Sequence, residues 1–574
     1  MEKIIDDLKW LREEIIGRNI LFETPFGEKP LVYADYTASG RSVQFIENYL
    51  MHILEFYANT HTEDDVTGKT MTELVHKAEN TIKRIVNAGK TGKIIFSGTG
   101  ATGGITRLQQ ILGVYWSPAT HHRMDILLNS CVLPNKDKTK ECHKKLLGYI
   151  EDNKPIVFVG PYEHHSNELM WRETLCEVVE IPLNLEGEID LIALQKITSA
   201  EKYANRQKIG SFSAASNVSG IITPVYEVAK ILHRNDAIAC FDFAACAPYI
   251  EIDMNRDDES YFDAIFLSPH KFLGGPGTSG LLIFNEKIYQ KELPPSIAAG
   301  GTVKFVTMEN ESYIDDIEAR EKPGTPGVLQ NIKSALVFEL KEKIGIQRIE
   351  RIEKYFLERF YDEFKDEKDI TFLGMTDANK KINIIPFNIL HRDRILHPKF
   401  VTKLLNDLFG IQTRAGCSCA GPYGHRLLDI SSETSKFYQC LIGVDNFEGV
   451  KPGWVRLNCH YSLALEEFDY IIKAIKFIIK NGYLFLKLYK FNFYDGEWKH
   501  LEENEKSFLQ NDFDEIIKMA KFEKKKVQNI TEIFAKNIQI ANQVAAGLKD
   551  SKKFEKFEKQ LEEMMFFYVI NYEK

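Results

Sequence analysis

The chain has 574 residues, of which 44% are hydrophobic and 27% charged, the balance of an ordinary globular protein. Its formal net charge of −9 argues against a nucleic-acid binder, which usually presents a basic face. No apolar run reaches the roughly 18 residues of a membrane span, so we expect no membrane association. The mixed acidic and basic N-terminus lacks the apolar core of a signal peptide, and the nine cysteines therefore predict reduced thiols in a cytoplasmic setting.

The first 330 residues predict a short helical segment followed by a large α/β domain. Residues 1–30 are expected to form one amphipathic helix and a connector. From 31 to 330, short β-rich runs alternate with helical patterns, which is typical of a mainly parallel sheet covered by helices. The predicted strands cover residues 93–96, 156–160, 177–182, 210–214, 237–241, 264–267 and 280–284.

The rest of the chain predicts two further parts. A Pro-Gly-Thr-Pro-Gly run leads into a long helical pattern that ends near residue 365, and a strand is expected at 382–387. We therefore expect a smaller C-terminal α/β domain over 331–485. Residues 486–574 show helical spacing and predict a helical extension. A polar stretch over 121–154 predicts a surface insertion.

A lysine beside a glycine-rich turn, in the segment SPHKFLGGPG at 268–277, is the strongest chemical signal. A lysine amine held against an aldehyde cofactor forms a Schiff base, as in pyridoxal-phosphate enzymes. The hydroxyl of Ser268 suits a phosphate oxygen, and the glycines let the backbone bend next to a bound ring. Taken alone, the run also fits a solvated turn.

A second glycine-rich segment, SGTGATGG at 97–104, lies between a predicted strand and a helical pattern. Free backbone N–H groups at the start of a helix favour a phosphate, and the hydroxyl of Thr102 adds a donor. An ordinary strand-to-helix turn explains the segment equally well. The chain shows neither a GxGxxG fingerprint nor a Walker lysine here, which disfavours NAD and ATP.

Two more strand ends carry polar groups. The segment EHHSN at 163–167 follows a predicted strand, and ligands of open parallel sheets bind at the carboxyl ends of strands. A histidine there can stack on a flat cofactor and take part in proton transfer, whereas adjacent histidines seldom share one zinc ion. Asp242 ends an apolar run, and a buried carboxylate needs a partner such as the protonated pyridine nitrogen of pyridoxal phosphate.

These segments, together with SNVSG at 216–220 and DFAACAP at 242–248, resemble class V aminotransferase-fold pyridoxal-phosphate enzymes. The resemblance covers residues 30–485 and is greatest to the group II cysteine desulfurases and selenocysteine lyases. It implies the fold type I of pyridoxal-phosphate-dependent transferases, with a large mainly parallel sheet and a smaller C-terminal α/β domain. It also implies pyridoxal 5'-phosphate as cofactor and a homodimer with shared active sites.

The resemblance implies a role for each matching residue. Lys271 would form the Schiff base and His164 would stack on the ring. Asp242 would pair with the ring nitrogen, and Asn217 would lie close to cofactor and substrate. The implied phosphate ligands are Ala101 (through its backbone), Thr102, Ser268 and His270, with Thr325 reaching the phosphate of the neighbouring subunit.

The segment RAGCSCAGP at 414–422 bears on the reaction. In the desulfurases an arginine precedes the nucleophilic cysteine by five positions, which implies Cys419 as nucleophile and Arg414 as a substrate-side residue. Arg456 matches the arginine that clamps the substrate carboxylate. A thiolate at Cys419 would take the sulfur of L-cysteine as a persulfide and release alanine. Cys417 would relay this sulfur or be structural.

Other interpretations stay open at this point. A class V aminotransferase, or another pyridoxal-phosphate lyase or epimerase, would not use Cys419. The cysteine pair also fits a metal site with His425 or Cys440. A non-catalytic scaffold is disfavoured because it has no need of the charged residues matched above.

One position departs from the family pattern. Three residues after Asp242 the desulfurases usually have a glutamine that bonds the phenolic oxygen of the ring, and here Ala245 stands in its place. The loss of this donor predicts a divergent branch of the desulfurases, whose substrate need not be cysteine. We expect an amino-acid substrate and a sulfur-acceptor protein as partners, and neither nucleic acid nor membrane.

Overall fold

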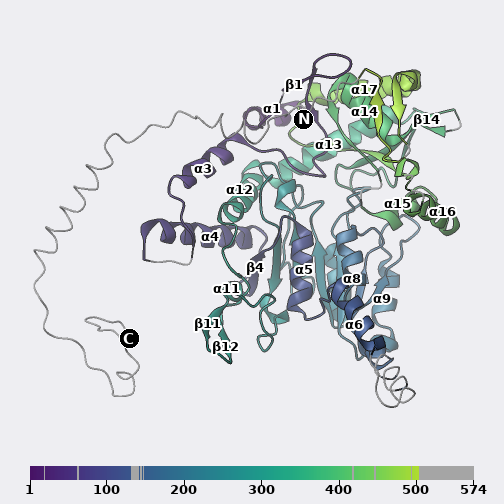
Figure 1. Cartoon of the computed structure of the whole chain (residues 1–574). Coiled ribbons are helices and arrows are strands. Elements are labelled where there is room, and N and C mark those ends of the chain that lie inside the picture. The colour runs from purple at the N-terminus through teal and green to yellow at the C-terminus, as the bar shows by residue number, and fades with distance from the viewer. Residues whose placement is uncertain are drawn as a thin grey trace, which may run out of the picture. The chain divides into compact units, whose positions relative to one another are not determined.

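The computed structural model describes residues 1–130, 141, 145 and 148–502, except residues 19, 61–63, 393, 417, 418, 445, 447 and 493. All of the described part belongs to one compact unit, Met1–Asn504 (Figure 1). No helix in this part combines the length and the apolar character that a membrane crossing requires.

The larger sheet of the described chain has seven strands. These are β4 (Gly92–Phe96), β5 (Ile156–Val159), β6 (Glu177–Glu180), β7 (Lys208–Ser213), β8 (Ala237–Asp242), β9 (Ala264–Leu267) and β10 (Leu281–Asn285). Their order is β4-β10-β9-β8-β7-β5-β6. Only β10 runs antiparallel to its neighbours, so the sheet is mainly parallel, as predicted. Each of the seven strands predicted for this sheet begins and ends within two residues of its observed bounds.

Helices cover both faces of this sheet. The strands are apolar on both sides, which is typical of parallel sheets buried between helices. On one face Phe241 packs in the same buried cluster as Val228 of α10 (Val225–Arg234). On the other face Phe266 packs with Ile105 of α5 (Ala101–Ile111). Side chains on the two faces of the sheet thus pack against two separate layers of helices (Figure 1).

A second sheet of five strands is antiparallel throughout. Its strands are β13 (Ile370–Phe372), β14 (Ile385–His391), β15 (Arg394–Ile395), β17 (Arg414–Gly416) and β18 (Trp454–Leu457). The strand predicted at 382–387 begins later than expected. The reason is that residue Ile382 donates its N–H to Gly220 O at 2.8 Å and so pairs with a loop beside the larger sheet.

The long helix predicted up to residue 365 is two helices. They are α12 (Val328–Ile344) and α13 (Ile346–Phe364), and Gly345 between them has φ +93°. This region of φ is favoured only for glycine, so the chain turns at this residue. The two helices pack against different parts of the molecule as a result.

The N-terminal segment also differs from its prediction. Two short helices, α1 (Glu2–Asp6) and α2 (Lys9–Glu13), replace the single one. Residues Ile5, Leu8 and Leu11 are all fully buried. In a continuous α-helix, residues spaced by three are displaced around the axis by roughly 60° each time. The break between the two helices lets all three side chains face the core.

Short paired strands complete the ends of the described chain. A hairpin of β1 (Leu21–Phe22) and β2 (Lys29–Pro30) precedes β3 (Val32–Tyr33), which pairs in parallel with β16 (Ile411–Gln412). In the described part of the predicted helical extension, a 3-10 helix (Gly482–Leu488) ends and a hairpin of β19 (Tyr489–Phe491) and β20 (Trp498–His500) follows. Residues 503–574 lie outside the described part.

The remaining helices and hairpin frame these sheets. They are α3 (Gln44–Leu54), α4 (Val66–Ile85), α6 (Pro118–Ser130), α8 (Leu169–Arg172), α9 (Leu191–Thr198), α11 (Ile317–Arg320), α14 (Pro398–Phe409), α15 (Gly421–Leu427), α16 (Ser432–Gly443), α17 (Leu465–Asn481), β11 (Val303–Val306) and β12 (Glu311–Tyr313). Of the predicted insertion, α6 carries the described N-terminal part.

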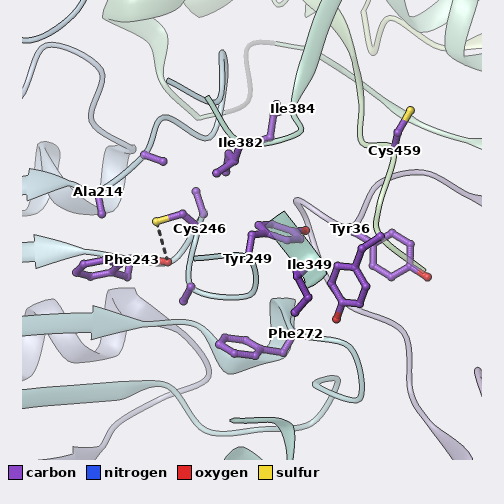
Figure 2. Close-up of a cluster of buried hydrophobic side chains, with 14 of the residues drawn as sticks. Tyr36, Ala214, Phe243, Cys246, Tyr249, Phe272, Ile349, Ile382, Ile384 and Cys459 are labelled. Atoms are coloured by element: carbon purple, nitrogen blue, oxygen red, sulfur yellow. Dashed lines mark hydrogen bonds between the residues drawn. The ribbon is translucent and has the colours of Figure 1, made fainter. Parts of the chain in front are cut away.

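One buried apolar cluster joins the two sheets. Figure 2 shows side chains from distant segments packed together, among them Tyr36, Phe243, Tyr249, Ile349 and Cys459. Each is at most 3% exposed. Burial of an apolar side chain such as Phe243 or Ile349 contributes on the order of 1.5–3 kcal/mol. The shared core holds the N-terminal segment and the second sheet against the carboxyl edge of the larger sheet.

Candidate active site

A cavity of about 470 Å³ lies at the carboxyl ends of the parallel strands. Its walls come from the loops after β4, β5, β7, β8 and β9, from the segment after β3, and from the second sheet. Eleven of the twelve predicted site residues line it, namely Ala101, Thr102, His164, Asn217, Asp242, Ser268, His270, Lys271, Arg414, Cys419 and Arg456.

The twelfth predicted residue, Thr325, lies elsewhere. It is on the exposed segment between α11 and α12, and its Oγ1 accepts a hydrogen bond from Asn59 Nδ2 at 3.2 Å. It does not line the cavity of its own chain. Its expected contact with a neighbouring subunit stays a prediction.

Lys271 ends a short 3-10 helix that directly follows β9. Desolvation in the cavity lowers the pKa of Lys271 to about 8, and the nearby Asp242 carboxylate opposes this shift. A larger share of the amine is therefore neutral near pH 7 than for an ordinary lysine. A neutral amine is the nucleophilic form.

Asp242 is the last residue of β8 and is 4% exposed. Its Oδ1 accepts the N–H of Ala244 at 2.9 Å. Burial raises the pKa of Asp242, while this hydrogen bond and Lys271 oppose the change. A carboxylate in this position is stabilised by a cationic partner in the cavity.

The glycine loop and Ser268 form a cradle at the start of α5. Ala101 donates its N–H to Ser268 Oγ at 2.9 Å. A Cβ on Gly100 would lie 3.1 Å from Ser268 Oγ and 3.5 Å from His270 Nε2, so a side chain there would crowd the cradle. Burial lowers the pKa of His270 to about 4, which keeps the ring neutral. The helix start and these side chains suit a phosphate.

His164 follows β5 and lines the same cavity. Its Nδ1 accepts the N–H of Ser166 at 3.1 Å, which assigns the ring proton of the neutral form to Nε2. Burial, with a smaller contribution from Lys271, lowers the pKa of His164 to about 4. The ring is thus a neutral, flat group over the cavity.

Glu163 supports this histidine and was not predicted as a site residue. The carboxylate is 4% exposed and accepts hydrogen bonds from Asn167 Nδ2 (2.7 Å), Ser213 N (2.8 Å) and Ser213 Oγ (2.6 Å). Burial raises its pKa to about 7. Glu163 thus fixes the loop after β5 to the end of β7. A buried acid inside the EHHSN segment was the available signal.

Strand register brings an acid and two arginines together. Tyr33 pairs with Gln412, so Asp35 and Arg414 lie two residues further along parallel strands, and Arg414 is opposite Arg456. Asp35 Oδ1 is 2.9 Å from Arg456 Nη2, and Asp35 Oδ2 is 3.7 Å from Arg414 Nε. Arg456 is 3% exposed, which makes Asp35 its compensating charge. No sequence signal pointed to Asp35.

Cys419 is exposed and contributes to the cavity wall. It has φ +57°, a conformation that is unusual for a residue with a side chain. Cys417 lies outside the described residues, so its predicted role has no structural account. No group of three or more potential metal-ligating His, Cys, Asp or Glu side chains occurs in the described part of the chain.

The larger sheet, with a lysine after one strand and an aspartate at the end of its neighbour, has the fold type I of pyridoxal-phosphate-dependent transferases. The model of the family "Aminotransferase class-V" matches residues 145–434, half of the chain. The chain belongs to this family and is an enzyme of it.

Relatives and solved structures agree with this assignment. A "Probable cysteine desulfurase" of Pyrococcus abyssi is 31% identical over 51% of this chain and 71% of its own length. One of Halalkalibacterium halodurans is 26% identical over 71% of this chain and 89% of its own length. The fold is similar to that of a cysteine desulfurase from Thermococcus onnurineus (TM-score 0.62, 21% identity, 82% of this chain and 98% of that chain). It is also similar to that of a cysteine desulfurase from Escherichia coli (TM-score 0.58, 17% identity, 78% and 94%).

Proposed function

We propose that this enzyme binds pyridoxal 5'-phosphate in the cavity and breaks the carbon–sulfur bond of L-cysteine. Alanine is released and the sulfur stays on Cys419. The observation that carries the proposal is that Lys271 and Cys419 line one cavity, although 148 positions separate them in the sequence (419 − 271). The likeness to curated desulfurases supports the same activity.

The cavity fits the proposed cofactor. The cradle of Gly100, Ala101 and Ser268 would hold the phosphate, and a Cβ at Gly100 would fill it. Buried Asp242 would face the ring nitrogen, and neutral His164 would lie against the ring. When bound, pyridoxal phosphate supplies an electron sink that acidifies the α-carbon of an amino acid and weakens the bond to a β-sulfur.

Lys271 is the group suited to hold and move the α-proton. Its pKa of about 8 lets the side chain accept a proton at Nζ and return it near neutral pH. Asp242 opposes full deprotonation, so both protonation states are within reach. His164 carries its ring proton on Nε2 and can donate a hydrogen bond from that atom.

Arg456 is the group suited to bind the substrate carboxylate. Its Nη1 donates to Asn217 O at 3.2 Å and its Nη2 faces Asp35, while its buried Nε has no hydrogen-bond partner among the described residues. A buried donor without a partner is costly, and a carboxylate would remove that cost. Arg414, which is 53% exposed at its side chain, would complete the anionic subsite at its rim.

Cys419 would receive the sulfur. Its thiolate attacks the substrate sulfur, the bond between that sulfur and the β-carbon breaks, and an S–S bond forms on the enzyme. The β-carbon takes up a proton, so cysteine and one enzyme thiol yield alanine and one persulfide. No external oxidant or reductant is needed for this step.

A second candidate function rests on Ala245. This small side chain lines the cavity where a hydrogen-bond donor to the ring oxygen would stand in a desulfurase of the usual pattern. A class V aminotransferase, or a lyase or epimerase that does not use Cys419, would still need Lys271 and Arg456. The two functions differ in whether Cys419 is required.

The proposal extends to the assembly of the enzyme. The enzyme would act as a cytoplasmic homodimer in which Thr325 reaches the phosphate of the neighbouring site. The exposure of Thr325 and of Cys419 supports contact with a second subunit and with a sulfur-acceptor protein, respectively.

The deciding experiment measures alanine and sulfide released from L-cysteine with a reductant. Wild-type protein should give both in equal amounts, and C419S should lose both while retaining its cofactor absorbance. C440S, which changes another exposed cysteine on α16, is the matched control and should keep full activity. Cofactor-loaded protein that forms no alanine would refute desulfuration and favour the second candidate function.

A further inference from the structure

His165 donates one hydrogen bond and accepts another at the two ends of the segment that carries Cys419. The backbone N–H of His165 donates to Cys419 O at 2.9 Å. Two residues further on, Gly421 donates its N–H to His165 Nε2 at 3.1 Å. One residue therefore fixes both ends of the tripeptide 419–421 against the loop after β5.

The second of these bonds meets a need of helix α15. The first N–H groups of a helix have no partner within the helix, and a side chain at the N-cap usually supplies one. The N-cap of α15 is Ala420, which has no acceptor in its side chain. His165 supplies the acceptor from another part of the chain, 256 positions away.

His165 itself is on a firmly held element. It begins the 3-10 helix His165–Asn167, and Asn167 is fully buried. Asn167 donates to Glu163 Oε2 at 2.7 Å and accepts from Trp171 Nε1 at 3.2 Å. The same loop carries His164 into the cavity, so the cofactor side and the cysteine side of the site share one support.

We infer that His165 is a positioning residue, which holds Cys419 at the cavity by anchoring the start of α15. Rotation about the backbone at 419–421 would otherwise carry the thiol away from the cavity wall. Burial lowers the pKa of His165, opposed by Glu168, so the ring is neutral and the Nε2 lone pair is available as acceptor. This inference rests on the proposed role of Cys419 and adds a residue that acts through it.

The test compares H165A with H165Q in the full-length enzyme. Glutamine places an amide oxygen near the position of Nε2, whereas alanine offers no acceptor. Loss of one neutral hydrogen bond corresponds to about a fivefold change in an equilibrium. We therefore expect kcat for alanine release to fall about fivefold in H165A, with KM and cofactor absorbance unchanged, and to recover in H165Q.

Hydrogen exchange at the Gly421 amide gives a second readout that needs no turnover. H165A should exchange this amide about fivefold faster, and H165Q should match wild type. Y423F is the matched control, because it removes the 3.0 Å hydrogen bond between the Tyr423 and Ser219 hydroxyls, which also holds α15 but involves neither Gly421 nor His165. It should leave Gly421 exchange and kcat unchanged.

The outcomes separate the two proposals. Unchanged Gly421 exchange in H165A, or a glutamine variant no better than alanine, would overturn the role of His165. If wild-type protein makes no alanine, desulfuration is refuted. The rates of Gly421 amide exchange and of Cys419 alkylation, compared between H165A and wild type, then still test whether His165 anchors this segment. Should H165A not fold, H165N replaces it, since its shorter amide does not reach Gly421.

Discussion

The site gives a quantitative prediction for the protonation of the Lys271 amine. With a pKa of about 8, roughly a tenth of the side chain is neutral at pH 7, against about three parts in ten thousand for an ordinary lysine with a pKa of 10.5. The amine should therefore react about 300-fold faster at pH 7 than an otherwise equal exposed lysine. Because the neutral form reacts, the rate rises with pH and levels off above the pKa.

The assay is competitive labelling with a trace of acetic anhydride between pH 6 and 11. Protein is first freed of carbonyl cofactors with hydroxylamine, and the peptide that holds Lys271 is quantified by mass spectrometry. Lys145, with a side chain 77% exposed, is the internal reference. A half-maximal labelling pH near 10.5 for Lys271 would refute the reasoning.

A matched pair of variants tests the cause of the shift. The Asp242 carboxylate raises the Lys271 pKa against desolvation, so D242N should move half-maximal labelling to a lower pH. D190N changes an aspartate that caps α9 and should leave the half-maximal labelling pH of Lys271 unchanged. A shift to higher pH in D242N would contradict the assigned sign. In cofactor-loaded protein, D242N should also lower turnover.

Two further predictions concern stability, measured by urea unfolding. D35A leaves the buried guanidinium of Arg456 without its anion, so it should lower the free energy of unfolding by about 3 kcal/mol and raise KM. E342A breaks an exposed pair with Arg84 and should lower the free energy of unfolding by only about 0.5 kcal/mol. Equal costs would contradict the role of burial. G345A places a side chain at φ +93° and should cost about 1 kcal/mol, whereas G443A, which has open space and an ordinary φ, should be near neutral.

The sequence predicted the parts of the site that depend on local order. Strands such as residues 264–267 are short apolar runs bounded by polar groups, and a parallel sheet brings together the residues just beyond their carboxyl ends. Asp242 ends such a run, and Lys271 and His164 follow one within five residues, so the strands account for their convergence. Their chemical roles came from the resemblance and stay proposals.

The parts that escaped prediction depend on register between distant segments. Asp35 and Arg456 are 421 positions apart, and only the pairing of β3 with β16 and of β17 with β18 brings them together. The break at Gly345 was equally hidden, since apolar spacing continues on both sides of it. Tertiary packing decides such points, and hydrophobic periodicity does not report it.

The same pairing explains why the two arginines stand at different depths of one site. Arg456 is on a central strand of the second sheet and is covered by β14 and β17, so its charge requires the permanent partner Asp35. Arg414 is on the edge strand β17 and is half exposed. Its Nε lies 3.7 Å from Asp35 Oδ2, so it interacts with that carboxylate more weakly than Arg456 does. A substrate carboxylate that enters the cavity can therefore recruit Arg414 without uncovering a buried charge. Under the proposed function, the deep arginine would set the orientation of the substrate, and the edge arginine, on the strand that leads to Cys419, would move to meet it.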